Sequence, residues 1–321
     1  MQPLFDALAH AVSTSTTTRQ QESILLDGRE YPVDTRRFAP IPHAARETTI
    51  TFVDGGQAEL LKAPNVALHF VRVAACTFHG TKRGGSQRHE FYVLTRAAGS
   101  EVAYETQLFP VRGEALLNAL RFNSMDATIR TGTERAEIGR IASLARRFAE
   151  LELARQSAKD AQVVVDGTLE ARVTGEQARL DALPPAVAAL AKTVALFTAQ
   201  GNVAAAVMHE LGIPQPWSYP IATLNGRTVA LVKLHAASDY VFRFEARGES
   251  ELLPALAAQS GDPVFLGYPY GLIWADRMAR VSNQEAAMLK TQFFTKLGAD
   301  AKRIRKYLNA ANAHEVLDSI G

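Results

Sequence analysis

Three β-rich segments follow one another between residues 48 and 97 with no helix between them. They are 48–56 (TTITFVDGG), 66–78 (VALHFVRVAACTF) and 89–97 (HEFYVLTRA), each rich in β-branched or aromatic residues. The first stops at Asp-Gly-Gly, and only a glycine-rich hairpin loop, 79–88, separates the other two. Consecutive strands joined in this way predict an antiparallel meander.

The remaining sequence alternates between helical and strand patterns. A short amphipathic helix is expected at 1–12, a polar linker at 13–22 and an extended or irregular segment at 23–46. Helices are predicted at 113–120, 133–158, 174–182, 202–211, 250–258 and from about 272 to 310, and strands at 161–169, 186–192, 217–223, 227–235, 239–246 and 263–267. This order favours an α/β fold with one mixed sheet covered by helices.

Composition sets broad limits on function. The 321 residues are 47% hydrophobic and carry 35 basic against 33 acidic side chains, and a net charge of +2 still permits a local nucleic-acid-binding patch. The lone Cys76 excludes an internal disulfide and a CxxC knuckle, and its apolar neighbours predict a buried thiol. Neither a signal peptide nor a run of about 18 apolar residues is found, so a cytoplasmic protein without a membrane span is expected.

Two aspartates follow β-branched runs. Asp54 ends ITFVDGG and Asp166 ends VVVDGTL, and both are expected at the carboxyl ends of buried strands, the edge where α/β sheets place their sites. Neighbouring strands would bring the two acids together. Two adjacent carboxylates ionise readily only with a cation between them, and Mg²⁺ or Mn²⁺ prefers such oxygen ligands. Each Asp-Gly taken alone is better explained as a simple turn after a strand, and only the two together make a shared site an equal alternative.

Further acids are available on two predicted helices. Glu150 and Glu152 precede the Asp166 strand, and helical phase from Phe148 favours Glu152 on the buried face. Asp276 follows Tyr268 by eight positions in the segment 265–285. The familiar motifs of other enzyme classes are missing, because the sequence contains no GxxxxGK[ST], GxSxG or HExxH.

Taken together, several segments resemble the NurA family of DNA-end-processing nucleases. They occur in the family's order and are FVDGG (52–56), ARRFAELELA (145–154), VVVDGTL (163–169), LAKT (190–193), FRFEA (242–246) and GYPYGLIWADRMARVSNQE (267–285). The resemblance implies a ribonuclease-H-like mixed sheet flanked by helices and Mn²⁺- or Mg²⁺-dependent cleavage of DNA. It also implies a homodimer that works with a HerA-type hexameric translocase at broken DNA ends.

The resemblance also implies roles for individual residues. Asp54 and Asp166 match the family's acids, Tyr268 matches its C-terminal tyrosine, and Asp276 falls where some members have histidine. Family spacing favours Glu150 as the helix ligand whereas helical phase favours Glu152, so both stay candidates. Lys192 matches a family lysine that would meet a phosphate, although an ordinary edge lysine explains it equally well.

The leading hypothesis is a metal-dependent nuclease that acts on single- and double-stranded DNA ends during double-strand-break repair. Its domains would be an N-terminal helix and extended segment (1–46), a NurA-type nuclease domain (47–297) and a C-terminal helical tail (298–321). Lys82, Arg83 and Arg88 in the hairpin loop would contact the DNA backbone, unless the loop is simply a solvated tip. The alternative is a non-catalytic DNA clamp or docking subunit of a translocase; a phosphokinase of related fold is disfavoured.

Overall fold

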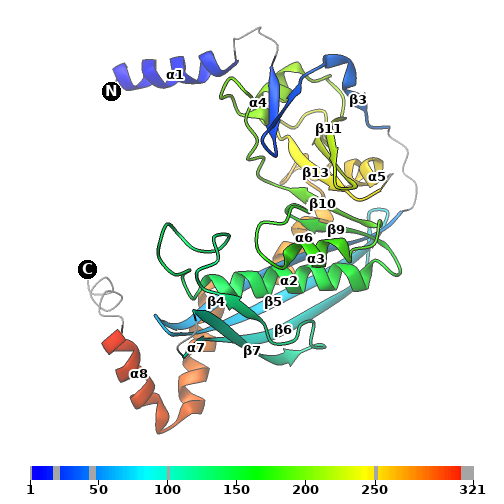
Figure 1. Cartoon of the computed structure of the whole chain (residues 1–321). Coiled ribbons are helices and arrows are strands. Elements are labelled where there is room, and N and C mark those ends of the chain that lie inside the picture. Colours follow the sequence, from blue (N-terminus) through cyan, green and yellow to red (C-terminus); the bar gives the residue numbers. More distant parts are fainter. Residues whose placement is uncertain (1, 17–21, 43–47, 100–101, 249–251, 312–321) are drawn as a thin grey trace.

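A long mixed sheet organises the protein, which we describe from a computed structural model covering residues 2–16, 22–42, 48–99, 102–248 and 252–311 (Figure 1). Within these residues the main sheet has eleven strands in the order β3-β11-β12-β13-β10-β9-β4-β5-β6-β7-β8, and β1 and β2 form a separate hairpin. The strands are β1 Ser23–Leu26, β2 Arg29–Pro32, β3 Ala39–Pro40, β4 Thr49–Ala63, β5 Val66–His79, β6 Lys82–Ala98, β7 Ala103–Arg112, β8 Arg121–Asn123, β9 Gln162–Asp166, β10 Val187–Ala191, β11 Trp217–Leu224, β12 Arg227–Lys233 and β13 Phe242–Ala246.

Helices cover both faces of this sheet and extend beyond its ends. The helices are α1 Gln2–Thr16, α2 Arg140–Ser157, α3 Glu176–Asp181, α4 Ala204–Leu211, α5 Leu252–Ala258, α6 Tyr270–Ala279, α7 Asn283–Leu297 and α8 Asp300–Ala311, with a 3₁₀ turn at Thr35–Arg37. Figure 1 shows α2 and α3 on one face, α6 behind the sheet, and α1 and the α7–α8 pair projecting from opposite ends. No described helix is both long and apolar enough to cross a membrane.

The strand order confirms the expected α/β fold. Strands β4, β5 and β6 form an antiparallel meander, β9 runs parallel to β4, and β10 runs parallel to β9. A meander followed by two parallel strands on its first edge is the arrangement of a ribonuclease-H-like sheet, which helices flank here as expected. The additional strands β13, β12, β11 and β3 extend the sheet beyond β10 in antiparallel pairs.

Alternation along the strands divides the core into two layers. Val163 and Val165 of β9 pack beneath α2, together with Val53 of β4. Val164 and Phe52 point to the opposite face and pack against α6. Because side chains alternate along a strand, Asp54 and Asp166 follow Phe52 and Val164 onto the α6 face. Full burial of each valine contributes roughly 1.5–3 kcal/mol, so this alternation fixes the register of the central strands.

Several predicted elements are wrong. The segment 113–120 is irregular because it pairs with β7 instead of coiling, with Thr106 donating its backbone N–H to the Leu120 carbonyl at 2.8 Å. The segment 263–267 consists of turns, and the helix expected from residue 133 begins at Arg140. Strands β7 and β8 were not predicted.

The two glycine-rich stretches also differ from expectation. Strand β4 does not stop at Asp-Gly-Gly but continues to Ala63, and β6 already begins at Lys82, so 82–88 is strand rather than loop.

Buried Cys76 agrees with its prediction; its thiol donates to the Gly271 carbonyl at 3.3 Å. Parts of the expected linker and tail, 17–21 and 312–321, lie outside the described residues.

Candidate functional site

Asp54 and Asp166 come to the same level of the sheet from adjacent strands. Val53 is paired with Val165 in the parallel register, and β9 ends one residue later at Asp166. Asp54 is therefore not at the end of its own strand; it lies where the neighbouring strand ends. Beyond Val53, β4 no longer pairs with β9. The two carboxylates face α6 at this position.

Glu150 approaches the same point from the opposite face of the sheet. An added side chain at Gly55 would collide with Glu150 Oε1, so the absence of a side chain is what lets α2 place this carboxylate against β4. Glu150 is only 4% exposed. Its Oε1 lies 3.5 Å from Arg146 Nη1 but has no hydrogen-bond partner among the described residues.

Glu152 lies elsewhere. It accepts hydrogen bonds from Arg155 Nη2 at 2.7 Å and from Gln156 Nε2 at 2.9 Å, and these partners lower its pKa. The helical-phase expectation that Glu152 continues the inward face is wrong, because α2 is buried on more than one side. One side of α2, formed by Ala145, Ala149 and Leu153, packs on the sheet. Phe148 instead packs against Phe122, away from the sheet.

The pKa of Asp54 lies far above that of an ordinary aspartate. Burial and the nearby carboxylates of Asp166 and Glu150 raise it to about 8, and the N–H of Gly55 and the Lys192 ammonium only partly offset this. Burial also raises the pKa of Glu150. Without a bound cation, this environment therefore disfavours the ionised forms of Asp54 and Glu150 beside Asp166.

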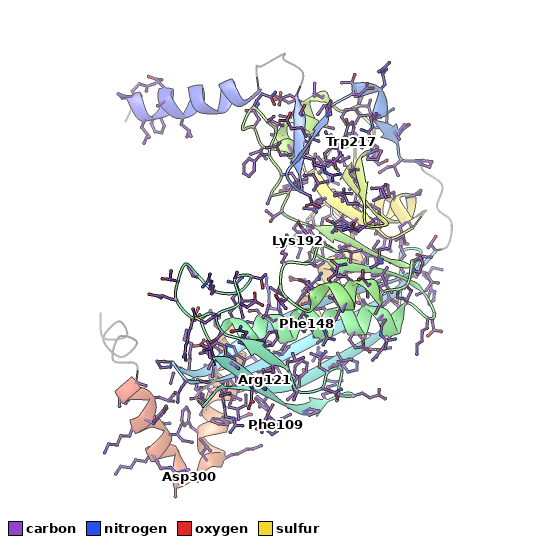
Figure 2. The ribbon with its side chains drawn as sticks, viewed as in Figure 1. Phe109, Arg121, Phe148, Lys192, Trp217 and Asp300 are labelled. Carbon is purple, nitrogen blue, oxygen red and sulfur yellow. The ribbon has the colours of Figure 1, made fainter. Side chains whose placement is uncertain are left out.

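Lys192 supplies positive charge at this point (Figure 2). It follows β10 on the α6 face, and its Nζ lies 2.7 Å from Asp166 Oδ2 and 3.5 Å from Asp276 Oδ1. Burial lowers the pKa of Lys192, but Asp166, Asp276 and Asp54 outweigh that effect and raise it. Among the described residues no three His, Cys, Asp or Glu side chains converge on one point as metal ligands do.

Tyr268 closes the inner side of the site. Its ring lies under Lys192, with Nζ 5.5 Å from the centroid, and its buried hydroxyl has no hydrogen-bond partner in the described part of the chain. Burial and the charges of Asp166, Asp54 and Asp276 raise the pKa of Tyr268, so the hydroxyl stays protonated. The structure therefore brings together Asp54, Glu150, Asp166, Lys192, Tyr268 and Asp276, and leaves Glu152 outside.

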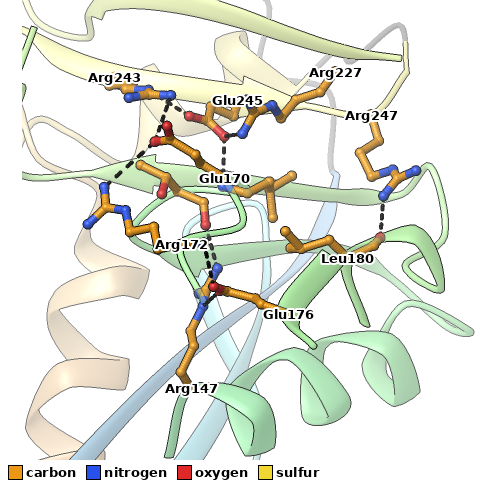
Figure 3. A network of polar contacts seen from close by, with 11 residues as sticks. Arg147, Glu170, Arg172, Glu176, Leu180, Arg227, Arg243, Glu245 and Arg247 are labelled. Atoms are coloured by element: carbon orange, nitrogen blue, oxygen red, sulfur yellow. Dashed lines mark hydrogen bonds and ion pairs between the residues drawn. The ribbon is translucent and has the colours of Figure 1, made fainter. Parts of the chain in front are cut away.

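A buried ionic network holds the segment that follows Asp166 (Figure 3). Glu245, which is fully buried, accepts the Leu169 N–H at 2.7 Å and pairs with Arg227 at 2.9 Å. It also pairs with Arg243 at 2.6 Å. No local sequence pattern indicated the contact between Glu245 and Leu169, because it joins β13 to the segment that follows β9.

Glycine at position 56 is required by the helix behind the sheet. A side chain added there would collide with the backbone carbonyl of Ala279 at the end of α6. We expect Gly56→Ala to lower the free energy of unfolding by about 1–3 kcal/mol, since backbone must shift to make room. Gly85→Ala is the matched control, because a side chain there meets nothing within 4 Å. Equal denaturant midpoints for the two variants would contradict the close approach of α6 to β4.

Comparison with known proteins supports the fold. No protein-family model matches the chain, and no curated protein sequence matches it. The crystal structure of the NurA nuclease from Sulfolobus solfataricus superposes with a TM-score of 0.55, covering 93% of this chain and 95% of that one at 11% identity. Another NurA crystal structure gives a TM-score of 0.53, with 84% and 92% coverage at 10% identity. The chain thus has the fold of the NurA structures, which confirms the resemblance at the level of fold.

Proposed function

We propose that this chain, which has a NurA-like fold, is a divalent-metal-dependent deoxyribonuclease acting on DNA ends. One observation carries the proposal. Asp54 and Asp166 lie at one level of adjacent strands with buried Glu150 beside them, and burial together with this crowding raises the pKa of Asp54 to about 8. Among the described residues the cationic neighbours of these acids are Lys192, Arg146 and Arg147, and the pKa of Asp54 stays raised despite Lys192.

The donor chemistry of the residues present fits a metal ion, and binding one would require these side chains to turn toward one another, because no three of them converge on one point in the described part of the chain. The unpartnered Glu150 oxygen and the protonation-prone Asp54 are both groups that a cation would satisfy, and carboxylate oxygens suit Mg²⁺ and Mn²⁺. Asp54, Glu150 and Asp166 would hold it, with Asp276 as a further candidate and Glu152 no longer favoured. A bound ion of this kind supplies an activated water and neutralises charge on the scissile phosphate.

Protein side chains would do the remaining work. Lys192, placed between Asp166 and Asp276, is positioned to donate to a phosphate oxygen once a metal neutralises Asp166. The protonated Tyr268 hydroxyl is a donor without a partner among the described residues and is suited to orient a phosphate or water. The Glu245 network would hold the segment after Asp166 in place during the reaction.

The test is cleavage of end-labelled single- and double-stranded DNA with Mn²⁺, Mg²⁺ or EDTA. Metal-dependent shortening of either substrate is expected, and EDTA should prevent it. No cleavage with either metal, with and without a hexameric translocase present, would contradict the proposal.

A non-catalytic DNA clamp or docking subunit is the second candidate. The 2.7 Å ion pair between Lys192 and Asp166 favours it, because this pair neutralises one acid without a metal. Calorimetric titration with Mn²⁺ distinguishes the two. Binding that Asp54→Asn weakens supports the nuclease, and no binding supports the clamp.

We also propose the partners that the resemblance implies. They are a second copy of this chain and a HerA-type hexameric translocase at DNA ends in double-strand-break repair, in the cytoplasm. The exposed α1 residues Leu4, Phe5 and Leu8, which are 53–65% exposed, support a docking role for that helix. The proposed domain limits remain 1–46, 47–297 and 298–321, and strand β3 joins the first segment to the main sheet.

The basic residues at the start of β6 are proposed to contact the DNA backbone. Arg83 lies over the Trp274 ring of α6 at 4.6 Å, on the face of the acids, whereas Arg88 is 3.7 Å from Glu90. Replacing Lys82, Arg83 and Arg88 by alanine should make duplex binding less salt-dependent, lowering the slope of log K by about 0.9 for each lost phosphate contact. Fluorescence titrations at several salt concentrations measure this slope.

A charge-matched variant of exposed α8 residues, with Lys302, Arg303 and Lys306 replaced by alanine, is the control. It should retain the wild-type slope. An unchanged slope in the β6 variant, or the same decrease in both variants, would remove this contact from the proposal.

A further inference from the structure

A groove of about 1040 Å³ opens beside Lys192, Tyr268 and Asp276. Its walls come from the segments 237–242 and 263–268 and from α6. The proposed cleavage chemistry uses only the inner end of this groove. The outer part is built from side chains that the reaction itself does not require.

A row of aromatic rings forms one wall and leads inward. Tyr240 at the rim is 63% exposed, its ring centroid lies 6.3 Å from that of Phe242, and Phe242 lies 5.2 Å from Tyr268. Lys192 then lies over the Tyr268 ring and contacts Asp166. The row therefore runs continuously from solvent to the acids.

A hydrogen-bonded turn presents apolar side chains to the same groove. Val264 is 77% exposed and Phe265 is 50% exposed. Asp262 holds the turn, since its side chain accepts the Val264 N–H at 2.9 Å and its carbonyl accepts the Phe265 N–H at 3.1 Å. Exposed apolar groups on a hydrogen-bonded turn that lines the same groove as an exposed aromatic ring are typical of a binding surface rather than of a solvated loop.

Cationic groups line the α6 side of the groove. Arg277 and Arg280 are exposed there, Arg277 lying 5.6 Å from the Trp274 ring centroid and Arg280 lying 3.8 Å from Asp276. With Lys192 they give three positive side chains along one wall. The acidic lining residues are Asp276, which belongs to the site, and Asp239, whose carboxylate lies 3.7 Å from His209 at the outer rim.

We propose that this groove binds an unpaired stretch of DNA at the strand end and guides it to the acids. Phosphates would lie toward Arg277, Arg280 and Lys192, while bases stack on Tyr240 and Phe265. Only unpaired bases expose their faces to such rings, because bases in a duplex are already stacked on one another. The inference rests on the proposed nuclease function and adds the form of substrate that the site receives.

Binding of a fluorescent oligothymidylate of roughly 15 nucleotides in EDTA tests the inference without requiring cleavage. Because stacking contributes about 1–3 kcal/mol per base, Tyr240→Ala and Phe265→Ala should each weaken binding by about 5- to 150-fold. Tyr240→Phe keeps the ring and should bind like the wild type. Phe109→Ala, which removes an exposed ring on β7, is the control and should also bind normally.

The outcomes separate this inference from the proposed function. Loss of oligothymidylate binding in the two groove variants, with blunt-duplex binding changed less than twofold, supports the groove even if no metal activates cleavage. Wild-type oligothymidylate binding by both variants overturns the groove even if the protein cleaves DNA with Mn²⁺. Equal losses for oligothymidylate and blunt duplex would also overturn it, since duplex bases cannot reach the rings.

Discussion

Replacing Asp54 or Asp166 by alanine is expected to reduce metal-dependent cleavage by at least about 1000-fold, equivalent to roughly 4 kcal/mol of transition-state stabilisation. Each substitution removes one of two carboxylates that meet where β9 ends. Cleavage of end-labelled DNA with Mn²⁺ measures the loss. Asp300→Ala, which removes an exposed aspartate from α8, should keep wild-type activity.

The same acids give a stability test that needs no activity. Since the folded-state pKa of Asp54 is about 8 against an ordinary 3.8, the metal-free folded protein binds more protons than the unfolded chain between these values. Its free energy of unfolding should therefore fall as pH rises from about 4 to 8. Asp54→Asn should remove this decline and stabilise the metal-free protein at pH 8 by on the order of 1 kcal/mol or more. A wild-type protein whose stability stays level over this range would contradict the raised pKa of Asp54, and with it the burial and crowding of this carboxylate.

Glu150→Gln is expected to abolish cleavage to a similar extent, whereas Glu152→Gln should retain it. Glu150 is buried against Gly55 beside the two aspartates, while Glu152 is engaged by Arg155 and Gln156 on another side of α2. Glutamine preserves size and removes the charge, so only a metal ligand should lose both activity and Mn²⁺ affinity.

The Glu152 variant should differ from wild type only in stability, by about 0.5 kcal/mol, because a partly exposed i,i+3 ion pair contributes little. Cleavage assays and Mn²⁺ calorimetry on both variants give the answer. Normal activity in Glu150→Gln would exclude the helix from metal binding, and inactivity of Glu152→Gln would reverse the assignment.

The sequence predicted the central part of the fold because its signal there is periodic and strong. The β-branched runs of β5, β9 and the first part of β4 are buried on both faces, and β6 alternates between buried and partly exposed side chains, so both patterns indicated strands without distant contacts. The helix predicted at 113–120 is wrong for the opposite reason. The leucines of this segment have helical spacing, but its backbone hydrogen-bonds to β7. A local sequence pattern identifies a helix or strand only where contacts with distant segments do not favour another conformation.

The candidate acids were identifiable from sequence, whereas their arrangement was not. Asp-Gly-Gly at 54–56 predicts the end of a strand, yet β4 continues because it stays paired with β5 through these residues. The two glycines instead admit helices that approach from opposite faces. The choice between Glu150 and Glu152 depended on which sides of α2 are buried, and that is set by segments far away in the chain. The ion pair of Lys192 with Asp166 likewise joins separate strands and leaves no local pattern.

The pairing of β9 with β4 has a consequence for a chain that is still being synthesised. The β4–β7 meander needs only hairpin contacts, which form quickly, whereas β9 must pair with a strand more than a hundred residues earlier. The site residues from Asp54 to Asp276 are all present only when α6 has been synthesised. At a synthesis rate of about 5–20 residues per second, this takes roughly 10–40 s after Asp54 itself appears. Under the proposed function, a growing chain can therefore carry a folded meander for many seconds before it has a complete site with which to cut DNA.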